Sequence, residues 1–206
     1  MAGLREKQKA QRRALIEKAA ADLFVEKGFA DATIEEIAER ALVSAPTVYN
    51  YYGTKGDLLL ALVARGEEGI EEAQDDFSKQ TAEHRPVELV AKVIHSNVND
   101  TLSALSRELW GHVVAFVATA SDPEVAPRYL ETIASGLGTA IESVLRNYQE
   151  DGKLRDGTDV HELAFLLTRM ERIHFLNYVY LKDMTVEDMH KAIAADVAMI
   201  VGPYEI

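Results

Sequence analysis

The chain has 206 residues, of which 48% are hydrophobic, with five prolines and no cysteine. This length is enough to bury a substantial core, and the lack of cysteine excludes disulfides and thiolate metal sites. No signal-peptide pattern opens the chain, and no apolar run approaches the roughly 20 residues of a membrane span, so we expect a soluble, cytoplasmic protein.

The net charge of −12 is unevenly distributed. Residues 1–56 contain nine basic and eight acidic side chains, whereas the remainder contains 13 basic and 26 acidic ones. Near the start, Glu6 is the only acid among five basic residues, which are Arg5, Lys7, Lys9, Arg12 and Arg13. An acidic protein is repelled by nucleic acid, but a basic end permits binding in one orientation. Alone, such an end could equally be a solvated helix terminus.

Helix signals follow one another from the start of the chain. A first helix is predicted over about Arg5–Lys27, with Gly28 placed to form a left-handed C-cap. Thr33 begins a capping box for a second helix, and Ser44 is the N-cap candidate of a third. No strand-like alternation or hairpin dipeptide competes with these signals, so we predict an all-α fold of about nine helices.

The rest of the chain is predicted to form longer helices. Capping residues and prolines place their starts near Thr54, Pro86, Ser106, Asp122, Asp159 and Thr185. The first of these is expected to continue to about Phe77, and the fourth from near Pro123 to Gln149. The helix over about 159–181 is apolar nearly all round, so we expect it to lie between its own domain and a second subunit. With the helix over about 185–201, it would contribute half of a four-helix bundle to a symmetric homodimer.

The segment from Thr33 to Tyr52 carries the most informative pattern. It reads as two short helices joined by a tight turn, and the second helix contains three tyrosines within four residues. This is the layout of a helix-turn-helix, in which the second helix enters the DNA major groove. The alternative is an amphipathic core helix, which leaves the agreement of caps and spacing unexplained.

The same residues closely resemble the tetracycline-repressor (TetR) family of transcriptional regulators. The resemblance rests on Thr33-Ile34, Ile37-Ala38, Val43-Ser44, Thr47-Val48-Tyr49, Tyr51-Tyr52, Thr54-Lys55 and Leu58, and it covers roughly residues 10–60. It implies a non-enzymatic homodimer that binds a palindromic operator, by default as a repressor, and is released by a small-molecule effector. The implied domains are a helix-turn-helix over 1–54 and a helical ligand-binding and dimerisation domain over 55–206. No cofactor is implied.

The resemblance also implies DNA-binding residues. These are Thr33, Ser44, Ala45, Pro46, Thr47, Tyr49, Asn50, Tyr51 and Lys55. The small residues at the tip of the recognition helix would face base edges, and Lys55 would meet a phosphate beside a helix N-terminus. Val48 and Tyr52 are expected in the core, where the Tyr52 hydroxyl needs a partner. Gly56 replaces a usual helix former and is expected to loosen the hinge between the two domains.

Polar and aromatic residues within apolar runs are candidates to line an effector pocket. They are His95, Asn99, Trp110, His112, Phe116, Arg169, Glu171, His174, Asn177 and Tyr178. For each of them a satisfied core or interface position is the alternative. The aliphatic and aromatic content of these helices favours an apolar or aromatic effector.

Two other classes of protein remain open. Glu171-x-x-His174 and Glu187-x-x-His190 have the spacing found in di-iron carboxylate bundles, although Glu187 is also explained by the dipole of its helix. The second class is a dimeric helical interaction protein that does not touch DNA. No Gly-rich phosphate loop, serine elbow or His-Glu-x-x-His metal motif occurs in the chain.

Overall fold

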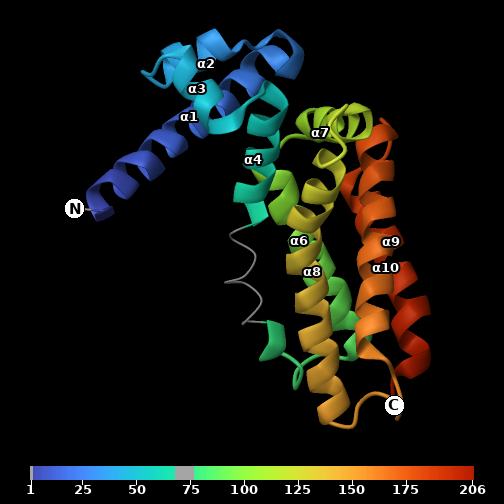
Figure 1. The fold of residues 1–206 in the computed structure, drawn as a ribbon. Helices are drawn as coiled ribbons and strands as arrows, with labels where there is room; N and C mark the ends of the chain where they lie inside the picture. The colour runs from blue at the N-terminus through green and yellow to red at the C-terminus, as the bar shows by residue number, and fades with distance from the viewer. Residues whose placement is uncertain (1, 68–76) are drawn as a thin grey trace. The chain divides into compact units, whose positions relative to one another are not determined.

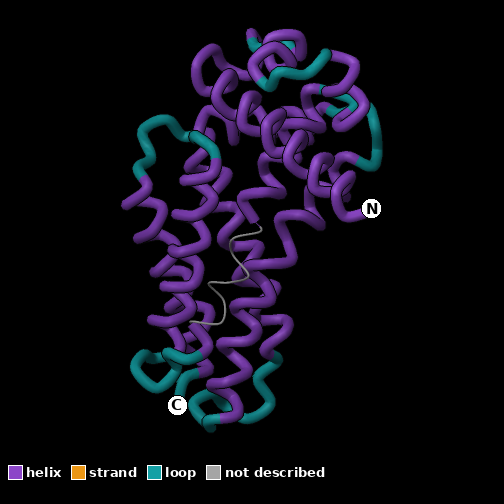
Figure 2. The backbone as a smooth tube through the Cα atoms, turned by 90° about the vertical axis from the view of Figure 1, so that its left-hand side faces the viewer, coloured by secondary structure: helices purple, strands orange, loops and turns teal. Residues whose placement is uncertain are grey.

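The computed structural model describes residues 2–67 and 77–206, and all regular structure in them is helical (Figures 1 and 2). The helices are α1 (Ala2–Asp31), α2 (Ile34–Arg40), α3 (Ala45–Tyr52), α4 (Lys55–Glu67), α6 (Pro86–Ala104), α7 (Arg107–Thr119), α8 (Val125–Glu150), α9 (Val160–Tyr180) and α10 (Val186–Val201). The all-α prediction is confirmed. The predicted continuation of α4 to Phe77 runs into residues outside the described part.

Local capping explains where most of these helices begin. The side chains of Thr33, Ser106, Asp159 and Thr185 each accept a hydrogen bond from the backbone three residues on. Gly28 has a φ of +80° and interrupts α1 where the C-cap was predicted, although a further turn continues to Asp31.

The start of α8 differs from the prediction. The helix begins at Val125, whereas Asp122 accepts a hydrogen bond from the Glu124 N–H in a short turn before it. A helix starting at Pro123 would place Pro127 beyond the first turn, where its ring clashes with the preceding carbonyl. Starting at Val125 instead brings Pro127 into the first turn, where no N–H is required.

The contacts divide the chain into two compact units. Unit 1 comprises Met1–Arg65 and Ala104–Tyr129, and unit 2 comprises Gly66–Ser103 and Leu130–Ile206. This division differs from the predicted boundary after residue 54, because most of α4, the whole of α7 and the first turn of α8 group with the helix-turn-helix.

In unit 1, α1 packs against α2 and α7, and α2 packs against α3. Its fully buried side chains include Ile16, Leu23, Phe24, Ile37, Val48, Leu58 and Leu59. Arg40 of α2 reaches both carboxylate oxygens of Glu26 on α1, at 2.6 and 2.8 Å. Lys27 and Glu36 form a second ion pair between the same two helices.

Unit 2 is a bundle of long helices, α6, α9, α10 and most of α8, which lie side by side in Figure 1. Its fully buried side chains include Leu89, Ile94, Ile141, Leu145, Leu167, Met189, Ile193 and Val197. The hydroxyl of Tyr148 donates to the carbonyl of His84 at 2.8 Å, and burial raises the pKa of Tyr148 to about 12. None of the helices in residues 2–67 and 77–206 combines the length and apolarity that crossing a membrane requires.

Candidate nucleic-acid interface and ligand site

A tight turn places α3 across the end of α2. The N–H of Leu42 donates to the Glu39 carbonyl at 3.1 Å, and the N–H of Val43 donates to the Ala38 carbonyl at 2.9 Å. Leu42 reaches this turn with a φ of +56°, a left-handed conformation that is strained for a leucine, and its side chain is 92% exposed. The turn is therefore enforced by its neighbours.

The two faces of α3 differ as a recognition helix requires. Val48 and Tyr52 are buried in unit 1, which confirms that prediction. The remaining side chains are available to a ligand to different degrees. Pro46, Tyr49 and Asn50 are exposed, whereas Ala45, Thr47 and Tyr51 are half-buried.

The N-terminal end of α3 lacks a side-chain cap. Ser44 is in the N-cap position, but its hydroxyl lies 2.8 Å from the Thr47 hydroxyl and does not cap a backbone N–H. Pro46 has no N–H and the Thr47 N–H donates to the Ser44 carbonyl at 2.9 Å, so the first turn offers an anion chiefly the Ala45 N–H. At the start of α2, Thr33 is exposed but its hydroxyl is engaged in the capping box with Glu36.

A buried carboxylate holds the other end of α3. The Tyr52 hydroxyl donates to Oε1 of Glu17 at 2.9 Å, and the Arg13 Nε donates to the same oxygen at 2.9 Å. Glu17 is only 5% exposed. Burial, and then the bond to Glu17, raise the pKa of Tyr52, so its hydroxyl remains a donor. Glu17 therefore supplies the partner that Tyr52 was expected to need.

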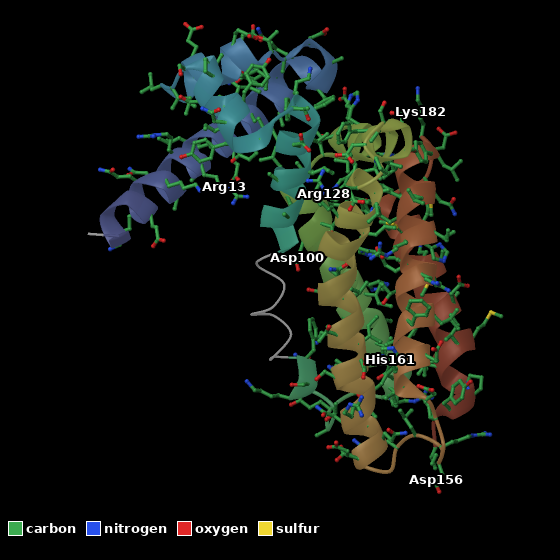
Figure 3. All side chains as sticks on the ribbon, in the orientation of Figure 1. Arg13, Asp100, Arg128, Asp156, His161 and Lys182 are labelled. Carbon is green, nitrogen blue, oxygen red and sulfur yellow. The ribbon has the colours of Figure 1, made fainter. Side chains whose placement is uncertain are left out.

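Glu17 was not among the predicted site residues. The available signal was its spacing from Ala20 and Phe24, which places an acid on the apolar face of the first helix. A charge is rarely retained on such a face without a partner. Figure 3 marks Arg13, the charged partner, on α1.

The position of Lys55 differs from the prediction. Its ammonium donates to the carbonyls of Phe29, Ala30 and Ala32 at 2.6, 3.0 and 2.9 Å, and it lies 4.7 Å from the centre of the Phe29 ring. An ammonium has three protons, and these three bonds use all of them. The expected phosphate contact is therefore replaced by a link from α4 to the end of α1, where the last carbonyls before and just after Asp31 have no partner within the helix.

Gly56 also has a role opposite to the predicted one. It is buried in α4, and a Cβ atom built on it would lie 2.2 Å from two ring carbons of Phe116 on α7. The missing side chain therefore allows a close approach of α4 and α7 and does not loosen this region. The glycine is a packing residue.

The predicted effector-binding residues do not form one cluster. Three of them lie on α7 in unit 1, where Trp110 is buried, His112 lies 5.4 Å from Phe29 between ring centres, and Phe116 packs on Gly56. The others, which belong to unit 2, are His95, Asn99, Arg169, Glu171, His174, Asn177 and Tyr178. Asn99 and Asn177 are exposed, Tyr178 is half-buried and Glu171 is buried.

Two histidines of this set link α10 to other helices of unit 2. His95 on α6 stacks on His190 with ring centres 4.3 Å apart, and its Nε2 donates to the His190 carbonyl at 3.0 Å. Burial, and then the proximity of His95, lower the pKa of His190. His174 on α9 lies 2.7 Å from a carboxylate oxygen of Asp196 on α10. Both pairs therefore have structural partners.

A groove of about 500 Å³ runs between α8 and α9 within unit 2. It contains one predicted effector residue, Arg169, whose guanidinium lies 3.8 Å from the centre of the Phe165 ring. Arg172 and Leu130 also line it. At one end, His161, marked in Figure 3, forms a 2.9 Å ion pair with Glu142 that raises the pKa of the histidine and lowers that of the glutamate.

Residues of the two Glu-x-x-His pairs form ion pairs with other side chains and do not face a shared metal position. Glu187 pairs with Lys191 at 2.6 Å, and His174 pairs with Asp196. In the part of the chain that the structure describes, no three metal-ligating side chains of the His, Cys, Asp or Glu type converge. The geometry gives no support to the di-iron alternative.

An apolar stripe is exposed along α9. Leu166, Ile173 and Tyr180 follow one another at seven-residue intervals and are each at least half exposed in the single chain. Met199 on α10 is 76% exposed. Exposed apolar side chains at this spacing are typical of a helix that packs against another chain.

Comparison with known proteins agrees with this geometry. Residues 16–62 match the model of the tetR family of bacterial regulatory proteins. A transcriptional activator, FasR of Mycolicibacterium smegmatis, is 32% identical over 75 residues, which make up 36% of this chain and about a third (34%) of that relative's length.

Solved structures show the same fold over nearly the whole chain. FadR of Thermus thermophilus, a TetR-family repressor in complex with lauroyl-CoA, has a TM-score of 0.71 at 24% identity and covers 91% of this chain and 92% of its own. FadR of Bacillus subtilis in complex with stearoyl-CoA has a TM-score of 0.60 at 20% identity, covering 91% and 97%. Residues 16–62 are therefore similar to the tetR family of bacterial regulatory proteins, and the chain shares its all-helical fold with solved structures over 91% of its length.

Proposed function

We propose that this transcriptional regulator is a homodimeric, ligand-responsive repressor that binds a palindromic operator and is released by a small-molecule effector. The observation that carries the proposal is α3, which is held by buried Val48 and Tyr52 and presents Pro46, Tyr49 and Asn50 on its exposed face. A short helix anchored on one side and polar on the other is suited to the major groove. Such a protein acts in the cytoplasm, where bacterial DNA lies.

The proposed contacts follow from exposure and chemistry. The uncapped start of α3 and the hydroxyls of Ser44 and Thr47 are suited to phosphate oxygens, and Ala45 and Pro46 are small enough to approach base edges. Tyr49, Asn50 and Tyr51 supply further hydroxyl and amide groups, and Thr33 flanks them at the start of α2. Lys55 is omitted, because its ammonium is engaged within unit 1.

The homodimer is proposed to form through α9 and α10. The stripe of Leu166, Ile173 and Tyr180 would pack on its two-fold copy, with Met199 beside it. The α10 helix also carries Ala195 and Ala198, which are exposed and small enough for a close approach of two helices. Burying this surface explains why the helix over 159–181 is apolar nearly all round.

For the effector we propose the fatty acyl-CoA class. The FadR structures similar to this chain contain lauroyl-CoA and stearoyl-CoA. The groove between α8 and α9 combines the cationic Arg169 and Arg172 with the apolar Phe165 and Leu130, which suits a ligand with anionic and apolar parts. This narrows the earlier expectation of an apolar or aromatic effector.

Repression is favoured over activation because the similarity to a repressor covers more of this chain than the similarity to an activator. The FadR repressor shares the fold over 91% of this chain, including unit 2, whereas the similarity to the FasR activator covers only 36% of it. The direction of regulation is set by the site and the effector, so the comparison that includes unit 2 carries more weight.

Selection of bound duplexes from a random pool tests the proposal. We expect a palindromic consensus whose affinity falls steeply as salt increases. Replacing Tyr49 with alanine should weaken operator binding by about 1–3 kcal/mol, because the residue is exposed on α3 and the substitution removes a group that touches DNA. Lauroyl-CoA or stearoyl-CoA at micromolar concentration should release the operator, whereas free CoA should not.

The matched control for Tyr49→Ala is Tyr204→Ala, which makes the same substitution at an exposed tyrosine of unit 2 outside α9 and α10 and should leave operator affinity unchanged. Recovery of no preferred sequence would exclude the repressor function. If the protein binds a palindrome but neither acyl-CoA thioester changes its affinity, the proposed operator stands and the proposed effector class is excluded.

A further inference from the structure

The first turns of α1 extend beyond the part of the chain that matches the tetR family. The family match begins at Ile16, whereas α1 begins at Ala2 and runs without a break to the kink at Gly28. Every side chain from Glu6 to Leu15 is exposed. In Figure 1 this part of α1 projects away from α2 and α3 of the same unit.

This extension is basic in an acidic protein. From Ala2 to Ile16 it carries five basic residues and one acidic residue, a net charge of +4, so the rest of the chain carries −16. In the described part of the chain, the side chains of Lys7, Lys9 and Arg12 make neither a hydrogen bond nor an ion pair. A helix that is polar on all sides and buries nothing gains no stability from packing, so its charges are available to a partner.

The base of the extension is fixed to the recognition helix. Arg13 donates to Glu17, and the same carboxylate oxygen accepts from Tyr52, the last residue of α3. Both bonds are 2.9 Å long, and Glu17 and Tyr52 are buried. The direction in which the extension projects from the rest of unit 1 is therefore set relative to the end of α3.

We propose that this basic arm, residues 2–13, contacts the phosphate backbone of the DNA that flanks each half-site. The inference rests on the proposed function, because it requires α3 in the major groove. At 1.5 Å per residue the arm extends roughly 18 Å, about half of one turn of B-DNA, so it reaches phosphates outside the bases that α3 can contact. Phosphate contacts add affinity and fix orientation without reading sequence.

The triple variant Lys7→Ala, Lys9→Ala, Arg12→Ala tests the arm. Alanine is the best helix former, so α1 is retained and an effect on binding is not an effect on folding. We expect operator affinity to fall at least about tenfold at 100 mM salt, and the slope of log K against log salt to decrease by about one for each phosphate that the arm no longer neutralises. The control Lys79→Ala, Arg155→Ala, Lys191→Ala makes the same change in net charge within unit 2 and should leave the slope unchanged.

The length of the duplex gives the second readout. Wild-type protein should lose affinity when the flanks are trimmed to the selected palindrome, and changing the flanking sequence at constant length should have no effect. The arm variant should bind trimmed and extended duplexes equally.

An unchanged salt slope together with an equal response of both proteins to trimming would overturn the arm proposal while leaving the repressor in place. If the DNA-free wild-type protein had a larger mass at low salt than the arm variant, the arm would instead bind the acidic body of a second copy. Wild-type protein without any operator preference would remove the proposed function, and the arm proposal with it.

Discussion

Leu42 is the residue at which the helix-turn-helix stores strain. Its left-handed backbone conformation costs a branched side chain about 1 kcal/mol, and its side chain is 92% exposed, so little burial offsets that cost. We predict that Leu42→Gly raises the free energy of unfolding by up to about 1 kcal/mol, because glycine adopts this conformation freely. Urea unfolding followed by circular dichroism measures the change.

Two further substitutions at position 42 separate strain from side-chain loss. Leu42→Asn should give part of the gain, since asparagine tolerates the left-handed region, whereas Leu42→Ala removes the side chain but keeps the strain and should change little. A glycine variant no more stable than the alanine variant would show that the turn is unstrained.

Single residues were the hardest feature to predict from sequence. The position of Lys55 at a helix start in the family motif predicts a phosphate contact, but its three acceptors lie 23 to 26 residues earlier in the chain. The pairing of Glu17 with Tyr52 joins residues 35 positions apart. Local spacing cannot reveal such pairs, although the break at Gly28 and the acid on an apolar face were the available clues.

At the scale of elements, the contact of α4 with α7 determines how unit 1 is closed. Gly56 lacks the Cβ atom that would lie 2.2 Å from the Phe116 ring, so the two helices meet where no other residue fits without a shift. We predict that Gly56→Ala lowers the free energy of unfolding by about 1–2 kcal/mol despite the better helix propensity of alanine. Urea unfolding of purified protein measures this difference.

The partner and a second glycine provide the controls. In a Phe116→Ala background the ring is gone, so Gly56→Ala should become neutral or stabilising. Gly138→Ala in α8 meets only an ordinary contact of 3.5 Å with Thr168 and should stabilise by up to about 1 kcal/mol. Additive losses in the double variant would contradict the proposed clash.

Elements themselves were predictable because their signals are local. The capping boxes at Thr33 and Thr185 and the N-caps at Ser106 and Asp159 are formed as the spacing indicated. The grouping of these helices into two units is harder to predict from sequence. That α7 belongs with the helix-turn-helix depends on contacts such as that of Phe116 with Gly56, which are sixty residues apart and leave no periodic pattern. The predicted effector residues are likewise divided between the two units, which sequence alone does not reveal because such long-range contacts leave no pattern in it.

At the scale of the whole molecule, the proposed function depends on two copies. A palindrome places its half-sites about 34–36 Å apart, so one chain can occupy only half of the operator. The exposed stripe of Leu166, Ile173 and Tyr180 is the surface proposed to join the copies. Affinity for DNA and self-association should therefore fail together when this stripe is disrupted.

Ile173→Asp provides the test. The residue is 58% exposed in the single chain, so the substitution should leave its fold intact, but in the dimer it would bury an unpaired carboxylate from each copy. We predict that dimer affinity falls at least about a hundredfold, a cost of roughly 3 kcal/mol, and that operator binding at nanomolar protein is lost. Val25→Asp, at another exposed apolar residue in unit 1, should change neither property. Sedimentation measures the mass of the protein, and fluorescence anisotropy measures its affinity for DNA. A dimeric Ile173→Asp protein would place the dimer interface elsewhere. A monomeric variant that keeps full operator affinity would show that α3 binds DNA without a second copy.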